Sequence, residues 1–476
     1  MCKTRFVLAT LRVAVLAMLG GDLFGGEQAA GFQWPAFQDI RYKEDWSVLA
    51  KRGPEGPRDP FDPLKYVPLS RDGFAWASFG GQVRERVEVW DDFSFGGPGR
   101  RDDSFLLSRF RLHGDFHFSP YFRIFIEGKS AHSTDRDLPG GRRTLDTDVL
   151  DLQNGFAEFS AFPSEKTKVS LRLGRQELAL GKERLVSTLD WANTRRTFDA
   201  VSAILKHEEW TVTTFWGRLV VVDRYHFNHD ADNMDLYGVY ASRAIGGGRL
   251  TFDLYWLGLK QDPATFNGTT GVERRHTAGA RLGGKLGTTG FDFDVEAAGQ
   301  FGRLGGQDIR AFMLASQLGY TLAKAPATPR VFVGLDYASG DHHRGGDIQT
   351  FNQLFPLGHA YCGYIDMVGR QNIVDLSTGI ELKPTKKLLV KLDGHYFWRA
   401  DNDDALYNAG GAVARAGNTG RSNDVGAELD LLLRYQVDRH QAVIGGCSHM
   451  FPGRFIEQSG PHEGIDLAYL IWQFTF

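Results

Sequence analysis

Apolar and polar residues alternate with a period of two along most of this chain, from residue 76 onward. In the run 104–118 (SFLLSRFRLHGDFHF), charged residues and histidines alternate with Phe, Leu and one Gly. A period of two with one polar and one apolar face indicates a half-buried β-strand. The same alternation recurs in 121–130, 291–300 and 424–435. The pattern therefore predicts an all-β protein.

About 18 segments qualify as strands, and bacterial single-chain outer-membrane barrels have an even number of strands. The predicted strands are 76–90, 104–118, 121–131, 151–161, 167–178, 198–206, 209–219, 234–243, 249–260, 274–285, 290–302, 308–322, 329–339, 371–383, 387–398, 423–436, 439–451 and 464–476.

The connections between these strands separate a membrane barrel from a soluble β-sandwich or β-helix. Short turns alternate with longer connections, as expected when one rim of a barrel faces the periplasm and the other the exterior. A sandwich has no reason to alternate in this way. The short turns lie at 119–120, 207–208, 246–248, 287–289, 384–386 and 437–438. The long connections are 91–103, 132–150, 179–197, 219–233, 340–370 and 399–422.

The last residues support the barrel interpretation. Leu470, Trp472, Phe474 and Phe476 share one face of the final predicted strand, and no later segment could cover them. Lipid can cover such a face, and closure of the sheet leaves no unpaired edge in the hydrocarbon. We therefore expect a transmembrane antiparallel β-barrel over 76–476, with a large soluble sandwich or β-helix as the alternative.

The residues before the barrel divide into two parts. Residues 1–30 combine basic residues at Lys3 and Arg5 with an apolar core, which predicts a cleaved signal peptide. A short anchor helix is the alternative. Residues 31–75 are rich in Pro and charge and form a predicted periplasmic lead, too short to be a substantial plug domain.

Composition narrows the class further. The hydrophobic content of 42% with a mean hydropathy of −0.30 excludes a helical membrane protein but not a barrel. The net charge of −3 gives no reason to expect nucleic-acid binding. Cys362 and Cys447 remain after cleavage; a disulfide between them is permitted in an exported protein, but two cysteines form neither a framework nor a metal site.

In a barrel, the charged face of each strand becomes the wall of the lumen. The expected inward cations are Arg84, Arg86, Arg109, Arg111, Arg123 and Arg172. The expected inward acids are Glu127, Asp292, Asp294, Glu296, Glu428 and Asp430. One interpretation is a solvated wall braced by arginine–carboxylate pairs. The other is an electropositive constriction that passes an anion by repeated weak contacts.

Enzyme and metal motifs are weak by comparison. The chain contains no G-x-S-x-G, H-E-x-x-H or Walker pattern. The stretches ASGDHHRGGD (338–347) and RADNDDALYN (399–408) contain possible ligands for a metal, but both also fit polar exterior loops, which we favour. We expect neither catalysis nor a cofactor.

Three segments resemble the alginate export family. They are DPFDPLKYVPL (59–69) with FGGQVRERVEVW (79–90), the stretch 171–200 containing LRLGRQELALGKERLV, and FNQLFPLGHAYCGYIDMVGRQNIVDL (351–376). The resemblance implies an 18-stranded outer-membrane barrel that exports a polyanionic polysaccharide through an arginine-rich pore, supplied by a periplasmic synthesis and modification complex. Arg370 departs from the family pattern, where an aromatic residue is expected.

The second of these segments also brings in Arg175 as a pore residue. The alternation along the strand does not support a pore position for Arg175, because Arg175 is in phase with Val169, Leu171 and Leu173, which should face lipid. Either Gly174 marks a bulge that turns Arg175 inward, or Arg175 lies above the hydrocarbon band. We expect the bulge.

These observations predict a passive channel of the bacterial outer membrane, built as a monomeric barrel, for an acidic polysaccharide such as alginate. The loop 340–370 is long enough to act as a lid. A general or anion-selective uptake porin is the alternative, and an outer-membrane enzyme or adhesin is a third.

Overall fold

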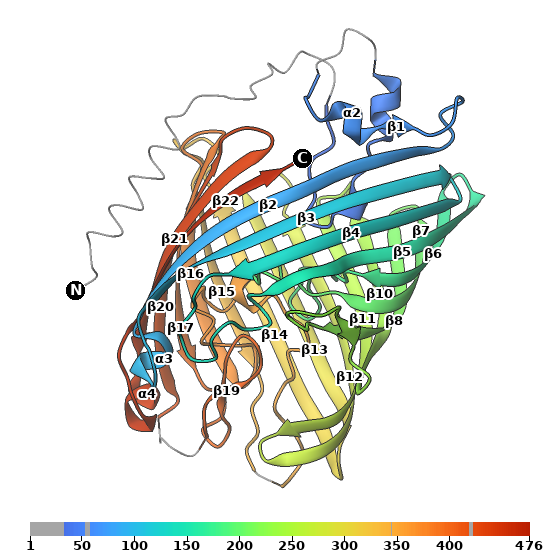
Figure 1. Cartoon of the computed structure of the whole chain (residues 1–476). Coiled ribbons are helices and arrows are strands. Elements are labelled where there is room, and N and C mark those ends of the chain that lie inside the picture. Colours follow the sequence, from blue (N-terminus) through green and yellow to red (C-terminus); the bar gives the residue numbers. More distant parts are fainter. Residues whose placement is uncertain (1–32, 53–57, 344, 418–421) are drawn as a thin grey trace.

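The computed structural model describes residues 33–52, 58–343, 345–417 and 422–476. The predicted signal peptide (1–30) lies outside these residues. Eighteen antiparallel strands form a closed barrel (Figure 1). They are β2 (Trp76–Asp91), β3 (Asp103–Ser119), β4 (Phe122–Ser133), β5 (Asp148–Ser164), β6 (Thr167–Gln176), β7 (Phe198–His207), β8 (Trp210–Val221), β10 (Met234–Ile245), β11 (Leu250–Phe266), β12 (Thr269–Lys285), β13 (Phe291–Leu304), β14 (Gln307–Thr321), β15 (Arg330–Ala338), β16 (Ile373–Leu382), β17 (Leu388–Trp398), β20 (Asp424–Gln436), β21 (Gln441–Pro452) and β22 (Ile465–Thr475).

Closure is made by β2, which pairs with both β3 and the last strand. Arg84 lies opposite Arg109 on one side and opposite Gln473 on the other. Each predicted strand corresponds to one barrel strand, so the expected fold class is confirmed. The period-two pattern identified the strands because every strand has one face toward lipid and one toward the lumen.

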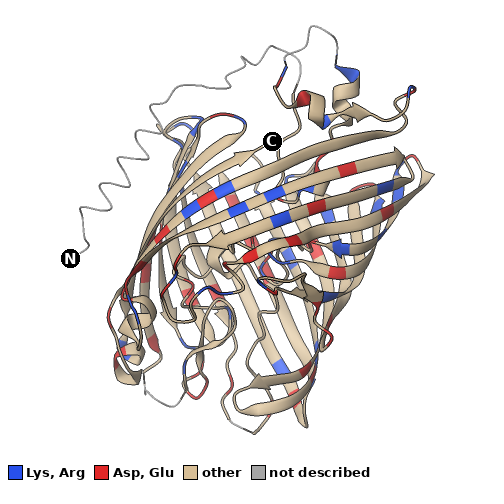
Figure 2. Ribbon diagram, viewed as in Figure 1, with Lys and Arg blue, Asp and Glu red and all other residues tan. Residues whose placement is uncertain are grey.

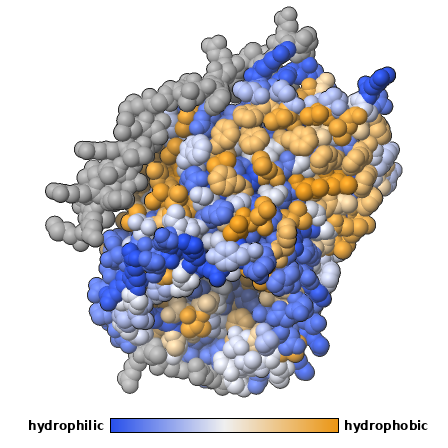
Figure 3. Space-filling view, viewed as in Figure 1, coloured by the Kyte–Doolittle hydropathy of each residue, from blue (hydrophilic) through white to orange (hydrophobic). Residues whose placement is uncertain are grey.

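The outer face of the barrel is apolar. Leu112 on β3 and Leu171 and Leu173 on β6 are among its exposed residues, Leu112 with 64% of its surface accessible. Figure 3 shows a hydrophobic region across the upper barrel, while the lower end is mostly hydrophilic. Contact of this band with hydrocarbon removes apolar surface from water, which is favourable.

The remaining elements are short. They are η1 (Arg41–Lys43), η2 (Ser47–Lys51), η3 (Gly358–Ala360), α2 (Asp62–Lys65), α3 (Phe93–Gly96), α4 (Arg454–Ser459) and the short strands β1 (Val67–Pro68), β9 (His229–Asp230), β18 (Leu406–Tyr407) and β19 (Val413–Arg415). No helix in the described part of the chain is long and apolar enough to cross a membrane.

The alternation of connection lengths holds with two exceptions. On the rim with the longer loops, β11 and β12 are joined only by Asn267 and Gly268, and β13 and β14 only by Gly305 and Gly306. The expectation of strict alternation is wrong at these two places because the strands themselves continue farther. Each of β11 and β12 has 17 residues.

The predicted periplasmic lead enters the barrel at the end where the chain terminates (Figure 1). The Tyr42 ring packs edge-on against Phe125 and Phe156, with ring centroids 5.6 and 5.0 Å away. The guanidinium of Arg41 donates to the carbonyl oxygen of Phe476 at 2.8 Å. A few residues of the lead therefore fill part of this mouth, although the lead is too small to be a separate plug domain.

Candidate functional site

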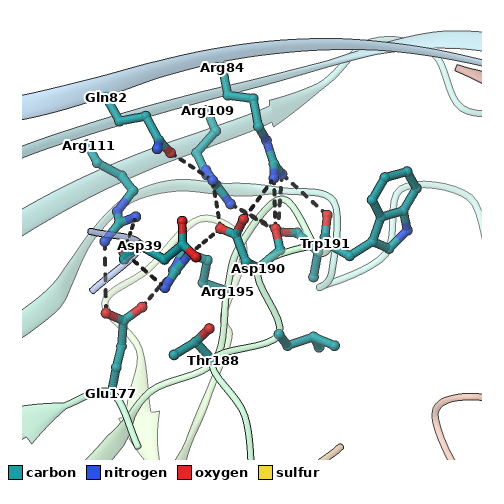
Figure 4. Close-up of polar contacts among 12 residues, drawn as sticks. Asp39, Gln82, Arg84, Arg109, Arg111, Glu177, Thr188, Asp190, Trp191 and Arg195 are labelled. Atoms are coloured by element: carbon teal, nitrogen blue, oxygen red, sulfur yellow. Dashed lines mark hydrogen bonds and ion pairs between the residues drawn. The ribbon is translucent and has the colours of Figure 1, made fainter. Parts of the chain in front are cut away.

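Arginines from the wall of the barrel bind a loop that folds into the lumen. This loop, 177–197, connects β6 to β7. Arg84 donates to the carbonyl oxygen of Asp190 at 2.7 Å, and Arg109 donates to the Asp190 carboxylate at 2.9 Å (Figure 4). Arg84 and Arg109 retain only 3% and 1% of their accessible surface. These two arginines therefore point inward, as predicted, but they anchor the loop.

The loop is shaped to present its carbonyl groups to these arginines. Leu189 and Arg195 both have positive φ, 51° and 53°. A non-glycine residue in this conformation costs about 1–2 kcal/mol. Charge-assisted hydrogen bonds from Arg84 and Arg109 to the carbonyl oxygens of Asp190 and Ala192 offset that cost.

A second group of charges connects the loop to the predicted periplasmic lead. Arg195 donates to Glu177 at 2.6 Å, and Arg111 forms an ion pair with Glu127 at 3.0 Å. The carbonyl oxygen of Asp39 accepts from both arginines at 3.4 Å (Figure 4). Arg111 and Glu127 thus lie inside the barrel as predicted, in a buried network rather than on an open surface.

The carboxyl group of Asp190 stays ionised within this network. Burial alone would raise the pKa of Asp190, but Arg109, Arg195 and Arg84 together hold it well below its ordinary value. The same balance applies to Glu177, whose pKa is lowered by Arg195 and Arg111 against the effect of burial. The network is therefore a set of compensated charges.

A second inward loop, residues 339–372 between β15 and β16, contacts the first. Val186 and Phe355 form a parallel β-bridge. The His359 ring stacks on Trp191 with centroids 3.7 Å apart, and the guanidinium of Arg86 lies 4.0 Å from the same indole. Within the predicted lid segment, the residues around Phe355 and His359 therefore lie in the lumen, and Arg86 stabilises the junction of the two loops.

Arg370, the departure from the family pattern, belongs to this second loop. Its guanidinium is 1% exposed and donates to Asp336 at 2.5 Å. It also lies 5.2 Å from the centre of the Tyr361 ring. Asp336 thus compensates the charge of Arg370, and Tyr361 provides an aromatic ring beside it.

Between the two loops and the end of the barrel with the predicted lead, the lumen opens into a cavity of about 1860 Å³. Its lining includes Tyr42 and Trp76 from that end and Gly181 and Tyr361 from the two loops. Twelve Lys or Arg and ten Asp or Glu residues line it. The whole cavity is thus nearly balanced in charge, and Figure 2 shows both signs along the barrel strands.

One side of the cavity is markedly cationic. We name it the basic wall; it consists of Lys43, Arg123, Lys168, Arg172 and Lys206. Glu158 accepts from Arg172 at 2.6 Å and lies 3.8 Å from Lys168. The side-chain ammonium groups of Lys43 and Lys206 form no ion pair or hydrogen bond with the described residues. Arg123 and Arg172 were expected here; the three lysines were missed.

The predicted inward acids also lie inside the barrel, but most of them are paired. Asp292 accepts from Arg330 at 2.8 Å, and Glu296 pairs with Arg184 at 3.1 Å. The remaining contacts are Asp294 with Arg184 and Arg281, and Glu428 with the backbone N–H of Ile365. Asp430 accepts no hydrogen bond from the described residues.

The prediction that a bulge at Gly174 turns Arg175 inward is wrong. The register of β6 with β5 and β7 runs unbroken through Gly174, so Arg175 stays on the outer face with Leu171 and Leu173. It forms ion pairs with Asp199 at 2.9 Å and Asp151 at 2.8 Å. Arg175 does not line the cavity. The irregular strand is β5, whose register with β4 shifts beside Glu127.

The residues missed from the sequence fall into two groups. Arg281 and Arg330 lie in predicted strands, and their parity could have identified them as inward. Arg184 and Arg195 lie in a loop with no period, so no pattern could place them. Their roles depend on the inward course of the loop.

The two polar loops considered for metal ions bind each other. His342 forms an ion pair with Asp401, and the Asp404 carboxylate accepts from Thr350 at 2.6 Å and from the backbone N–H of Asp341 at 3.1 Å. These acids therefore serve loop structure. The permitted disulfide is also absent, since Cys362 and Cys447 are not joined.

Several solved porins share this architecture. A BenF-like porin from Pseudomonas fluorescens Pf-5 aligns with a TM-score of 0.56 and 12% identity over 84% of this chain and 98% of that chain. OccK2 (OpdF) from Pseudomonas aeruginosa, in complex with glucuronate, gives 0.55 and 11% over 87% and 98%. OpdK from the same organism, with vanillate, gives 0.55 and 9% over 84% and 98%.

These likenesses show the fold alone. No curated protein shows significant sequence similarity to the chain. A family model described as "alginate export" matches residues 75–469, which include every strand of the barrel except the end of β22. The protein therefore belongs to the alginate export family.

Proposed function

We propose that this protein is an outer-membrane channel through which an acidic polysaccharide leaves the periplasm. Family membership and the porin-like barrel support the channel. The observation that carries the choice of an anionic substrate is the basic wall, where Lys43 and Lys206 have no ion-pair partner among the described residues. A carboxylate-bearing chain would supply that partner.

The arrangement suits conduction better than tight binding. Three cations of the basic wall lie on the neighbouring strands β6 and β7, where Lys168 is directly opposite Lys206 in the register and Arg172 is on the same face of β6 as Lys168. A polyanion can move from one cation to the next, while Glu158 weakens each contact. A channel needs binding sites strong enough for entry and weak enough for exit.

The carboxylate ligands of two structural neighbours agree with this choice. OccK2 is in complex with glucuronate, a uronic acid, and OpdK with vanillate, an aromatic carboxylate. We infer that the basic wall accepts uronate units in a similar size range. The same proposal has two further parts. A periplasmic synthesis complex supplies the substrate, and the protein acts as a single barrel without catalysis.

An uptake porin for small anions is the second candidate. The observation that favours it is the contact between the two inward loops at Val186 and Phe355. Loops joined in this way narrow the lumen and would favour small solutes over a polymer. On this alternative the basic wall would bind single carboxylates moving inward.

Conductance of the full-length protein in planar bilayers distinguishes the candidates. We expect anion selectivity that falls in the double variant Arg172→Ala, Lys206→Ala, and block by a polyuronate but not by a neutral polysaccharide of equal length. Arg175→Ala is the matched control, because this arginine is on the outer face of β6 and does not line the cavity. Block by monomeric glucuronate with no effect of polymer would favour the uptake porin. Equal selectivity in all variants would contradict a role for the basic wall.

A further inference from the structure

A buried group of metal-type ligands lies in the barrel wall, opposite in character to the basic wall. Asp393 and His395 belong to β17, and Asp430 belongs to β20, directly opposite Asp393 in the register. One ligand atom from each residue lies within 4.8 Å of the other two. Asp393 is 3% exposed and Asp430 is 0% exposed. These side chains converge from two paired strands on one point.

The histidine is held in a suitable orientation by a fourth residue. His395 Nδ1 lies 3.0 Å from both carboxylate oxygens of Asp375 on β16. In the neutral ring, this contact favours the tautomer with its proton on Nδ1, which leaves the lone pair of Nε2 for a metal. A histidine that binds a metal usually donates its other ring N–H to a carboxylate or carbonyl group in this manner.

Acidic side chains outnumber basic ones around this group, so a bound cation would be favourable. The group contains two acids, Asp393 and Asp430, and two more, Asp375 and Glu428, lie on the paired strands beside it. The one lysine in contact is Lys391, whose Nζ lies 2.5 Å from Asp393. Burial of an ionised carboxylate without a partner is unfavourable by several kcal/mol.

The carboxylate oxygens themselves show where the cation would lie. Neither oxygen of Asp430 accepts a hydrogen bond from the described residues, and the same holds for Oδ1 of Asp393 and Oε2 of Glu428. Ser448, opposite Asp430 on β21, has the nearest hydroxyl group in the register, and its oxygen is also without a hydrogen bond. Asp430 is thus a fully buried acceptor directed into a cluster of other acceptors.

We propose that Asp393, His395 and Asp430 bind a divalent cation, with Zn²⁺ the best match. One imidazole and two carboxylates suit Zn²⁺, whereas Ca²⁺ prefers ligands that are all oxygen. Donors around a tetrahedral Zn²⁺ lie about 2.0–2.2 Å from the metal and therefore about 3.4 Å from one another. The three ligand atoms lie within 4.8 Å of one another, so they would have to approach by up to about 1.4 Å when the metal binds.

The cation would be accessible from the lumen. Asp393, His395 and Lys391 all line the 1860 Å³ cavity, so an ion can enter from that side. Three protein ligands leave a fourth coordination position, and the cavity is the open direction. Lys391, with 24% of its side chain exposed, can move away from Asp393 when the metal binds.

Two arrangements without a metal ion would also reduce the negative charge of this group of acids. His395 could stay protonated between its acids, or Glu428 and Asp430 could share a proton. Neither arrangement gives stoichiometric binding of Zn²⁺ that depends on these side chains. Zinc titration therefore separates them from the proposal.

The test uses the full-length barrel in detergent, without a polyhistidine tag and after treatment with a chelator. Isothermal titration with ZnCl₂ should show one site per chain, with CaCl₂ bound much more weakly. Asp430→Asn and His395→Gln should each weaken Zn²⁺ binding at least ten-fold. Asp375→Asn should weaken it by about 10–100-fold, as expected for loss of the orienting carboxylate.

His449→Gln is the matched control. His449 also pairs with an acid, Asp466, at 2.8 Å, but it is outside the group of three ligands. Its zinc affinity should equal that of the parent. The proposal is overturned if the parent binds no stoichiometric Zn²⁺, if Ca²⁺ binds more tightly, or if Asp430→Asn and His395→Gln both bind as the parent does. Heat-modifiable mobility in gels confirms that each variant is folded.

Discussion

The guanidinium of Arg109 donates to the carboxylate of Asp190 at 2.9 Å, which ties strand β3 to the loop 177–197 in the middle of the lumen. Asp190 also forms ion pairs with Arg195 and Arg84. One carboxylate thus compensates three guanidinium groups. The relationship explains why an arginine-rich wall does not by itself produce an electropositive opening.

Removal of this carboxylate should therefore expose the positive charge of the wall. We expect Asp190→Asn to raise the anion-to-cation permeability ratio by about two-fold or more, because the charges of Arg84, Arg109 and Arg195 lose their common partner. Reversal potentials under a KCl gradient measure this ratio. Asp199→Asn is the control, since the Asp199 side chain has the same 37% exposure but pairs with Arg175 on the outer face. An equal shift in both variants would contradict the explanation.

Much of this architecture could be predicted from the sequence, for a simple physical reason. Membrane strands must be apolar on one face, so parity identified each strand and the inward direction of Arg84 and Arg109. The contacts of those arginines could not be predicted. Arg84 and Arg109 bind backbone carbonyl groups of Asp190 and Ala192, which have no side-chain signature.

The error at Gly174 has a different cause. A glycine inside a strand fits either a bulge or a close approach between backbones, and the sequence does not separate the two. The structure shows a close approach, because a Cβ at Gly174 would lie 2.3 Å from the carbonyl oxygen of Gly155.

Substitution of Gly174 should therefore damage the barrel. Its φ of 126° is unfavourable for any residue with a Cβ, and the contact with Gly155 adds a backbone clash. We expect Gly174→Ala to destabilise the fold by at least about 2 kcal/mol and to lower the yield of heat-modifiable barrel. Gly299→Ala is the control, since nothing lies within 4 Å of its added Cβ. Equal yields would show that β6 adjusts without cost.

Lys65 in the predicted periplasmic lead should make docking of this segment depend on pH. Burial, assisted by the charge of Arg41, lowers the pKa of Lys65 from 10.5 to about 7. Lys65 is 1% exposed, and its Nζ lies 4.8 Å from the centre of the Trp46 ring with no hydrogen bond to a described residue.

The sign follows from proton linkage. Between pH 7 and 10.5 the undocked segment keeps the proton on Lys65 and the docked segment does not, so docking strengthens as pH rises. The slope should be about 1.4 kcal/mol per pH unit across that window. Protection of the lead from proteolysis, measured at several pH values, should follow this trend. Lys65→Met should remove it, and a trend that persists in this variant would exclude Lys65 as the cause.

The bridge between Val186 and Phe355 gives a test of whether the inward loops must separate for transport. Bridged residues on neighbouring strands lie about 5 Å apart, close enough for a disulfide. We expect Val186→Cys, Phe355→Cys to form a cross-link that leaves conductance for small ions intact. Passage of a polyuronate should stop when the cross-link is oxidised and return with a reductant, because a polymer needs the loops apart. The parent protein under the same oxidising conditions controls for Cys362, which is buried. Polymer passage through the oxidised variant would mean that the loops stay joined during transport.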